Sequence, residues 1–486
     1  MKILSAKETI ALINKIENLV DVKNWVVQDI HVWPIIRIHL AHQLNSVITH
    51  KSKNDFQALY PFLKKILRLI FNSIKNALKS SNNNADVLFL TYTVSKQIKQ
   101  NGKWVDVYVE PIVNVLETIG LKYIILEYVG KRIYEYPVKR KSDIIDYKIF
   151  LNLIRARIYE HTINSNNTSD YLNQIDTILR QHNLMCTFSE KFIKRKISQL
   201  VFNYKYFHAV LKKYNPKIVF TTSYFSWGIA LNLACNSLNI PSVDIQHGIQ
   251  GEYHPAYGRW YNIPGEGYPG LPSVFAVWSS KEKSAIESWC NGTMHQAVVF
   301  GNNFSRYIPE STVVFSHLFD SNKIHVLVSL QKGRGLPALY QDLISLKKNI
   351  FWWIRKHPRM TTEEIKDINK ILSDLKTSNY NFADASSLDL YILLRHMHFH
   401  ITEFSTVALQ ASAFNIPTIL VDESGKDYFE SEILEGNTFY INNAQEIIDK
   451  IDTNADISKS TYSQTNSESD TNIKSFLNKY FLSSII

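Results

Sequence analysis

The chain has 486 residues, of which 45% are hydrophobic and 20% charged. This composition is typical of globular proteins and excludes a disordered chain. The 54 Lys and Arg outnumber the 44 Asp and Glu by ten, which favours anionic partners such as nucleotide phosphates, nucleic acid or an acidic membrane surface. The three cysteines, Cys186, Cys235 and Cys290, match no zinc-binding spacing and cannot all pair, so we expect a reducing compartment.

No apolar run reaches the roughly 18 to 20 residues that span a bilayer, and the N-terminus is predicted to be a helix of the mature protein, so a cytoplasmic location is expected. The segment 61–80 carries five Lys and Arg and no acid beside an apolar stripe. Such a helix can lie peripherally on the anionic inner face of the cytoplasmic membrane. The alternative is a helix packed on its own domain with a solvated basic face.

After this helical region, short apolar runs alternate with amphipathic segments, which is the pattern of parallel sheets covered by helices. The first series has predicted strands at 86–90, 122–126, 217–221, 242–246, 273–277 and 298–300, and helices at 105–119, 143–214 with a break near 164–167, 227–238 and from 279. The second series has strands at 324–328, 351–354, 398–402 and 417–421, and helices at 336–348, 361–375, 388–394 and 406–414.

The predicted fold class is therefore α/β, with two tandem Rossmann-like domains and a helical N-terminal extension. The predicted boundaries are 1–84 for the extension, 85–308 and 309–455 for the two domains, and 456–486 for a polar linker with a C-terminal helix.

Ligands of doubly wound sheets bind beyond the carboxyl ends of the strands, and this rule selects His247 in the first domain. It follows the strand 242–246 and precedes Gly248, which permits a tight turn. An imidazole at this place, with Asp244 or Glu252 nearby in the sequence, can act as a general base. The alternative is a structural histidine bonded to a loop carbonyl. His254 in the same loop is a weaker candidate.

In the second domain, Arg355, Lys356, His357 and Pro358 follow the strand 351–354. Two cations and an imidazole suit a diphosphate, and the proline ends the strand.

The strand 398–402 ends at Glu403, and Ser405 and Thr406 open the next helix. Hydroxyls and N–H groups at such a position can bind an anion, although an ordinary helix cap also explains Ser405. The loop that begins with Gln331, Lys332 and Gly333 brings further cations and flexible backbone to the same edge.

Three other patterns are rejected. The segment 265–270 matches GxGxxG but has prolines around it and no strand before it, so it is predicted to be a loop. His396, His398 and His400 alternate along a strand, but no carboxylate triad accompanies them, and a core strand explains them better than a metal site. The chain has no groove-reading motif, so no nucleic-acid partner is expected.

The order QHG, KHP and EFST on two tandem α/β units resembles GT-B glycosyltransferases of bacterial surface-polysaccharide synthesis, a group that includes capsule sugar transferases and teichoic-acid glycerophosphotransferases. The resemblance covers roughly 86–421. It implies a nucleotide-sugar donor on the second domain and an oligosaccharide or lipid-linked acceptor on the first, where Gly248 and His254 would lie on the acceptor side. It also implies that His357, Ser405 and Thr406 contact the donor and that His247 lies at the base or acceptor position.

The function predicted from the sequence is an inverting glycosyltransferase. No DxD pattern is present, so no metal and no cofactor are expected. A nucleotide-sugar 2-epimerase, a CDP-glycerol-type polyol-phosphate transferase and a non-catalytic scaffold of a polysaccharide-assembly complex are the alternatives.

Overall fold

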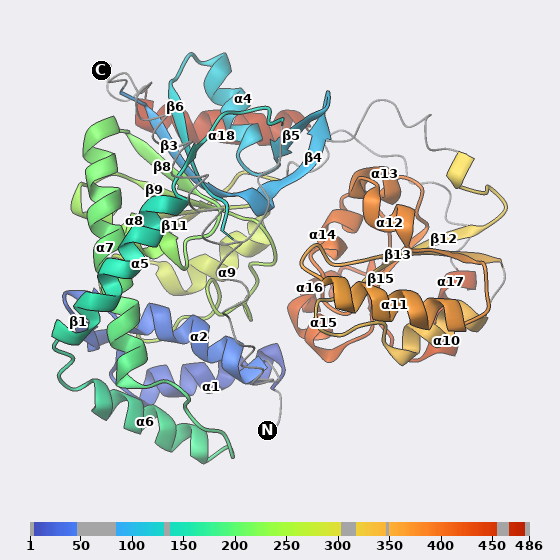
Figure 1. Ribbon diagram of the computed structural model, residues 1–486, viewed down its shortest axis with the longest axis horizontal. Coiled ribbons are helices and arrows are strands. Elements are labelled where there is room, and N and C mark those ends of the chain that lie inside the picture. Colours follow the sequence, from blue (N-terminus) through green and yellow to red (C-terminus); the bar gives the residue numbers. More distant parts are fainter. Residues whose placement is uncertain are drawn as a thin grey trace. The chain divides into compact units, whose positions relative to one another are not determined.

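The computed structural model describes residues 4–45, 84–130, 137–302, 317–346, 349–453 and 466–481. The chain divides into two compact units, of which the first comprises Met1–Asn303 with Ser467–Ile486 and the second comprises Phe304–Asn466 (Figure 1). The segment 61–80, for which membrane contact was predicted, lies outside the described residues. Among the described helices, none is both long and apolar enough to cross a bilayer.

The first unit contains a seven-stranded sheet in which all neighbouring strands are parallel, in the order β11-β10-β9-β8-β3-β6-β7. Its central strands are short apolar runs that are buried throughout, as expected for a sheet covered on both faces. The strands are β3 (Val87–Tyr92), β6 (Tyr123–Tyr128), β7 (Asp143–Ile144), β8 (Ile218–Thr221), β9 (Ser242–Ile245), β10 (Val274–Val277) and β11 (Gln296–Val299). Strand order reverses between β3 and β8.

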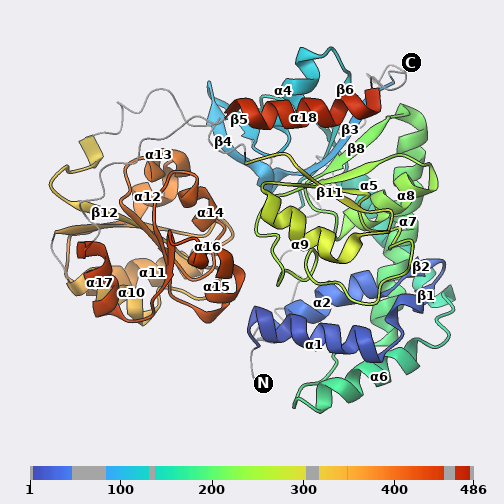
Figure 2. The ribbon, with the colours of Figure 1, turned by 180° about the vertical axis from the view of Figure 1, so that it is seen from behind.

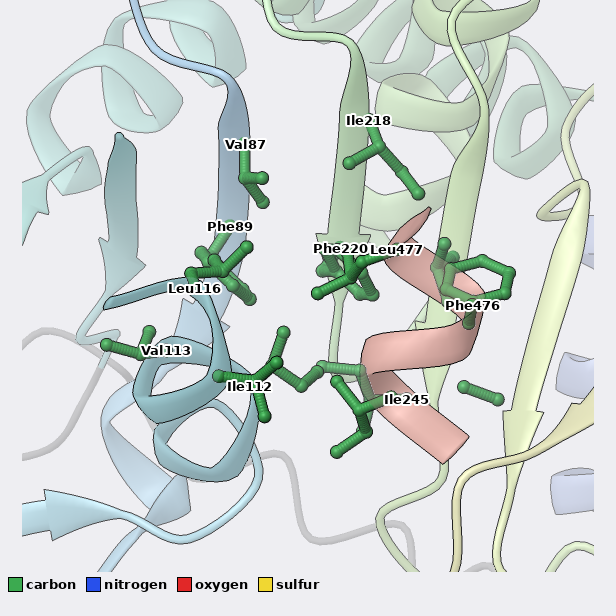
Figure 3. Packing of buried hydrophobic residues seen from close by; sticks show 14 of the residues in the cluster. Val87, Phe89, Ile112, Val113, Leu116, Ile218, Phe220, Ile245, Phe476 and Leu477 are labelled. Carbon is green, nitrogen blue, oxygen red and sulfur yellow. The ribbon is translucent and has the colours of Figure 1, made fainter. Parts of the chain in front are cut away.

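Two helices from opposite ends of the sequence close one face of this sheet (Figure 3). They are α4 (Glu110–Thr118) and the C-terminal helix α18 (Asn466–Phe481). Ile112 of α4 and Phe476 of α18 belong to the same buried cluster as Phe89 and Phe220 of the strands. The C-terminal helix therefore completes the core of the first unit, although the second unit precedes it in the sequence.

The other helices of this unit include α7, which packs against both α5 and α8. They are α5 (Asp146–Tyr159), η3 (Glu160–Thr162), α6 (Thr168–Arg180), α7 (Glu190–Tyr214), α8 (Trp227–Ser237) and α9 (Ser280–Cys290). The N-terminal segment adds α1 (Ala6–Leu19), η1 (Val22–Asn24), β1 (Val26–Val27), β2 (Ile30–His31) and α2 (Trp33–Asn45). A capping box between Ser5 and Glu8 starts α1.

The predicted helix 105–119 begins later than expected. After η2 (Thr93–Ser95), the chain forms a hairpin of β4 (Lys96–Gln100) and β5 (Lys103–Asp106). Asp106 ends the hairpin, because its carboxylate accepts the N–H groups of Tyr108 and Val109, each at 3.1 Å, before α4 begins.

The second unit contains a six-stranded parallel sheet in the order β14-β13-β12-β15-β16-β17, and its helices are labelled in Figure 2. Its strands are β12 (Ile324–Ser329), β13 (Ile350–Arg355), β14 (Tyr380–Asn381), β15 (Phe399–Thr402), β16 (Thr418–Leu420) and β17 (Thr438–Tyr440). Its helices are α10 (Ala338–Leu346), α11 (Thr362–Asp374), α12 (Ala383–Ser387), α13 (Leu390–Leu394), α14 (Val407–Ser412), α15 (Glu423–Tyr428), α16 (Glu430–Leu434) and α17 (Ala444–Thr453). The predicted fold class of two parallel α/β units is confirmed.

Candidate functional site

The second sheet changes direction between β12 and β15. From β12 the chain proceeds outward to β13 and β14, and from β15 it proceeds the other way to β16 and β17. Loops that leave the two central strands diverge at such a point and open a crevice at the carboxyl edge of the sheet, which is where open α/β sheets bind ligands. The loops at this point are 330–337 after β12 and 403–406 after β15.

An arginine joins these two loops to a third one. The Nη1 atom of Arg334 lies 2.7 Å from Oδ2 of Asp422, which follows β16, and Nε lies 3.4 Å from Oε2 of Glu403, which follows β15. The guanidinium also lies over the ring of Phe404, 5.1 Å from its centroid. Arg334 itself remains 41% exposed, so a planar cation faces solvent at the switch point while two carboxylates hold it.

Glu403 is the buried member of this cluster. Its side chain is 7% exposed, and burial raises its pKa to about 7, against the opposing effect of Arg334, while the nearby Asp422 raises it further. The carboxyl group therefore changes charge near neutral pH. Gly425 packs directly against the backbone of Glu403. The contact is so close that a Cβ at this position would overlap the carbonyl oxygen of Glu403.

The predicted residues of the loop after β12 differ in their contacts. Gly333 is anchored, since its N–H donates to Oε1 of Glu364 at 2.7 Å. Lys332 is exposed. Among the described residues, no group hydrogen bonds to Nε2 of Gln331 or to the buried hydroxyl of Tyr340 nearby, so both have a hydrogen bond to offer.

Arg355, the first of the predicted cations, is the last residue of β13 and makes structural hydrogen bonds. Nη1 of Arg355 donates to the carbonyls of Ala385 (2.6 Å) and Leu388 (2.8 Å), so Arg355 holds α12 in place. Lys356 and His357 are half-buried, Pro358 is exposed, and Nδ1 of His357 accepts the N–H of Arg359 at 3.1 Å.

Ser405 lies just before Thr406, which is the N-cap residue of the following helix. The Ser405 hydroxyl accepts the N–H of Val407 at 3.3 Å, and α14 has only six residues. Thr406 is exposed and its side chain makes no capping hydrogen bond. The phosphate contacts predicted for Ser405 and Thr406 stay predictions.

Beneath these loops, His400 links three strands inside the sheet. Its ring nitrogens lie 3.0 Å from the Ser329 hydroxyl and 3.2 Å from the Thr418 hydroxyl, and all three side chains are buried. Burial lowers the pKa of His400 to about 3, so the ring is neutral. Within the described ranges, no three or more His, Cys, Asp or Glu side chains are arranged to hold a metal ion.

In the first unit, His247 follows β9 in a turn that the neighbouring side chains hold. Gln246, which sequence reasoning did not include among the candidates, donates from Nε2 to the carbonyl of Gly248 (3.0 Å) and accepts the N–H of Trp278 (2.7 Å). The imidazole lies between the rings of Tyr108 and Phe225, with centroids 6.3 and 5.9 Å away. Dense packing lowers its pKa to about 4, so His247 is a neutral base at physiological pH.

The two candidate carboxylates, Asp244 and Glu252, differ in burial and in their partners. Asp244 is 1% exposed and accepts a hydrogen bond from the Tyr257 hydroxyl at 2.9 Å. Its burial raises its pKa to about 8, so it holds its proton at neutral pH. Glu252 is exposed and pairs with Nε of Arg259 at 3.0 Å. His254 has its pKa lowered to about 3 by burial, and its Nδ1 accepts the N–H of Ala256.

The switch point of the first sheet lies between β3 and β8, next to β9 rather than at it. Tyr92 ends β3 and Thr222 follows β8, and both hydroxyls are buried without a hydrogen-bond partner among the described residues. Sequence reasoning missed both residues. The strand order would have been needed to find them.

Comparisons with known proteins identify the fold. No protein-family model matches the chain, and no curated protein matches it. A Listeria monocytogenes structure assigned as a UDP-N-acetylglucosamine 2-epimerase is 10% identical, with 82% of this chain and 98% of that one aligned at a TM-score of 0.50. A second UDP-N-acetylglucosamine 2-epimerase structure is 11% identical over 82% of this chain and 97% of that one, also at 0.50. The Neisseria meningitidis enzyme bound to UDP-GlcNAc aligns at 0.49.

What these structures share with the chain is the GT-B-like arrangement of two Rossmann-like units. The narrower resemblance to capsule sugar transferases is not confirmed, since no family model matches the chain. The main functional prediction from the sequence, a glycosyltransferase, is therefore wrong, because the similar structures are nucleotide-sugar 2-epimerases, the alternative that the sequence left open.

Proposed function

We propose that the chain is an enzyme that binds a nucleoside-diphosphate sugar and inverts the sugar at carbon 2. The observation that carries the proposal is the contact of Arg334 with Glu403 at the switch point of the second sheet. A guanidinium suits diphosphate oxygens, and a carboxylate accepts hydrogen bonds from ribose hydroxyls. Because similar folds carry the name UDP-N-acetylglucosamine 2-epimerase, UDP is the first nucleotide to test.

Removing the proton at carbon 2 leaves an electron pair that no neighbouring carbonyl accepts, so the pair must form a double bond to carbon 1 as the nucleoside diphosphate leaves. Re-addition of the nucleoside diphosphate to carbon 1, with protonation of carbon 2 from the opposite face, gives the epimer, so the reaction needs a base and an acid. Two titratable groups whose surroundings move their pKa values in opposite directions suit these roles. His247, with a pKa of about 4, is the candidate base. Asp244, with a pKa of about 8, is the candidate proton donor.

The nucleotide part of the proposal is tested by calorimetry with UDP, CDP, GDP and UDP-N-acetylglucosamine. We expect one of them to bind, and Glu403→Gln and Arg334→Gln to weaken its affinity about tenfold or more, since hydrogen bonds to charged groups contribute about 1.5 to 3 kcal/mol. Glu435→Gln is the matched control because Glu435 is exposed on the same unit. Unchanged affinity in both site variants would remove the switch point from nucleotide binding.

The chemical part is tested separately in D2O without any acceptor. Deuterium that enters at carbon 2, together with a new isomer in the proton NMR spectrum, supports epimerisation. Binding without either change would keep the nucleotide site and reject the reaction.

Peripheral membrane contact through 61–80 remains a proposal. It rests on the sequence of that segment. Changing Lys64, Lys65 and Arg68 to Gln should weaken binding to anionic vesicles.

A further inference from the structure

Helix α5 exposes three apolar side chains in one line. Leu151, Ile154 and Ile158 are 40%, 47% and 73% exposed, and their spacing of three and four residues puts them on a single face. The helix cannot rotate to hide them, because its opposite face makes buried polar contacts with α7. Nδ2 of Asn152 donates to Oδ1 of Asn203 at 3.1 Å, and the Ser198 hydroxyl donates to the carbonyl of Ala156 at 2.6 Å.

Cations border this stripe on both sides. At 100° per residue, Lys148 and Arg155 lie along one edge of the stripe and Arg157 along the other, and all three are exposed. The only acid of α5 is the buried Asp146. The adjoining Glu160 is also buried and is shared between Arg157 and Arg195, each at 3.2 Å.

Helix α7, which lies beside α5, is also rich in Lys and Arg. α5 runs along α7 in both views (Figures 1 and 2). The two helices together contain ten Lys and Arg and two Asp and Glu. The outer face of α5 is itself apolar along a narrow line, with exposed cations on either side.

We propose that the outer face of α5 docks on an anionic lipid surface, with Leu151, Ile154 and Ile158 entering the interface between headgroups and acyl chains and Lys148, Arg155 and Arg157 contacting phosphate groups. An apolar stripe between two rows of cations is the arrangement by which a helix lies in such an interface. Charge decides between the occupants. A second copy of α5 would bring like charges together, and so would the segment 61–80, which has five cations and no acid.

The test is co-sedimentation of the full chain with vesicles of phosphatidylcholine, with or without a third of phosphatidylglycerol, at about 0.1 M salt, where the Debye length is about 10 Å. We expect binding to the anionic vesicles only. Ile154→Glu combined with Ile158→Glu should weaken it at least tenfold. Arg155→Gln combined with Arg157→Gln should weaken it about 25-fold and reduce its salt dependence, since each cation near the surface contributes about fivefold in affinity.

The matched control is Lys366→Gln with Lys370→Gln, which removes two exposed cations from α11 and should change binding little. Circular dichroism should be unchanged in all variants, since every altered side chain is exposed. A lower melting temperature is expected only with Arg157→Gln, which removes one of the two ion-pair partners of the buried Glu160. Three results would overturn the proposal: no binding of the unaltered chain, binding by both α5 variants that equals that of the unaltered chain, or a dimer in sedimentation velocity that the Ile154→Glu and Ile158→Glu changes abolish. If both α5 variants bind as well as the unaltered chain, any membrane contact belongs to another segment.

Discussion

Arg37 on α2 and Glu17 on α1 form an ion pair at 2.8 Å in which neither side chain is exposed to solvent. The other side-chain nitrogens of Arg37 and the second carboxylate oxygen of Glu17 hydrogen bond to the backbone of the loop after β9. Nη2 of Arg37 donates to the carbonyls of Gly258 (3.0 Å) and Arg259 (3.1 Å), and Glu17 accepts the N–H of Tyr261 at 3.0 Å. The N-terminal helices thus hold the loop that begins at His247.

Arg37→Met should destabilise the first unit by about 3 to 5 kcal/mol, because it leaves the Glu17 carboxylate buried without its partner. Burial already raises the pKa of Glu17, which shows how costly its charge is. Urea unfolding followed by tryptophan fluorescence measures the change. Arg180→Met, which removes an exposed ion pair with Asp176, is the control and should cost less than about 1 kcal/mol. Equal midpoints for the two variants would mean that the buried pair has no special weight.

Gly425→Ala should displace Glu403, because the added Cβ overlaps a backbone carbonyl that cannot move aside without its strand. We expect a lower melting temperature, with a loss on the order of 1 to 3 kcal/mol, and weaker nucleotide affinity. Gly265→Ala is the control, since its Cβ would meet no atom within 4 Å. Equal behaviour of the two variants would exclude close packing as the reason for Gly425.

Asp244→Asn should flatten the dependence of stability on pH. The pKa of Asp244 is raised from 3.8 to about 8 in the folded chain, so between these values the folded state holds a proton that the unfolded state has released. Stability is therefore full at low pH and falls as pH rises toward 8. The asparagine is neutral throughout, so its melting temperature should decline less between pH 5 and pH 9 than that of the unaltered chain. Parallel curves would mean that Asp244 ionises at its ordinary pKa.

Phe476→Ala should cost about 3 to 5 kcal/mol, the usual effect of removing a buried aromatic side chain. Its ring lies 5.2 Å from that of Phe300 and is 3% exposed. Ser475→Ala, at an exposed position of the same helix, is the control. If α18 were a dispensable tail, both variants would unfold at the same urea concentration.

At saturating nucleotide sugar, kcat should have its acid limb near pH 4 and its basic limb near pH 8, because the base His247 loses activity only when protonated and the donor Asp244 only when ionised. In kcat/KM we expect a further change near pH 7, where Glu403 of the nucleotide site changes charge. His247→Ala should lower turnover about 100-fold or more while nucleotide affinity stays within about twofold. An acid limb near 6.5 would indicate a base other than His247.

The fold class and the inner strands of both sheets could be read from the sequence, because strands buried on both faces are short and largely apolar. The short strands β7, β14 and β17 and the hairpin of β4 and β5 were not predicted. The strand predicted at 242–246 is β9, and that predicted at 351–354 is β13. The location of candidate residues after strands also followed, since the rule about carboxyl ends depends only on where a strand stops. Arg334 was visible only as a loop cation, because its partners Glu403 and Asp422 are 69 or more positions away in the sequence.

Only the tertiary structure decided which strand ends are neighbours, which carboxyls are buried and where the last helix packs. Asp244 looks like an ordinary strand residue, yet the closure of the Tyr257 loop over it removes water and raises its pKa. Helix α18 follows a polar linker in the sequence, but its apolar side chains are buried against the sheet of the first unit. Local patterns determine which segments form strands and helices, whereas charge states and long-range contacts depend on desolvation by residues that the chain brings together only when it folds.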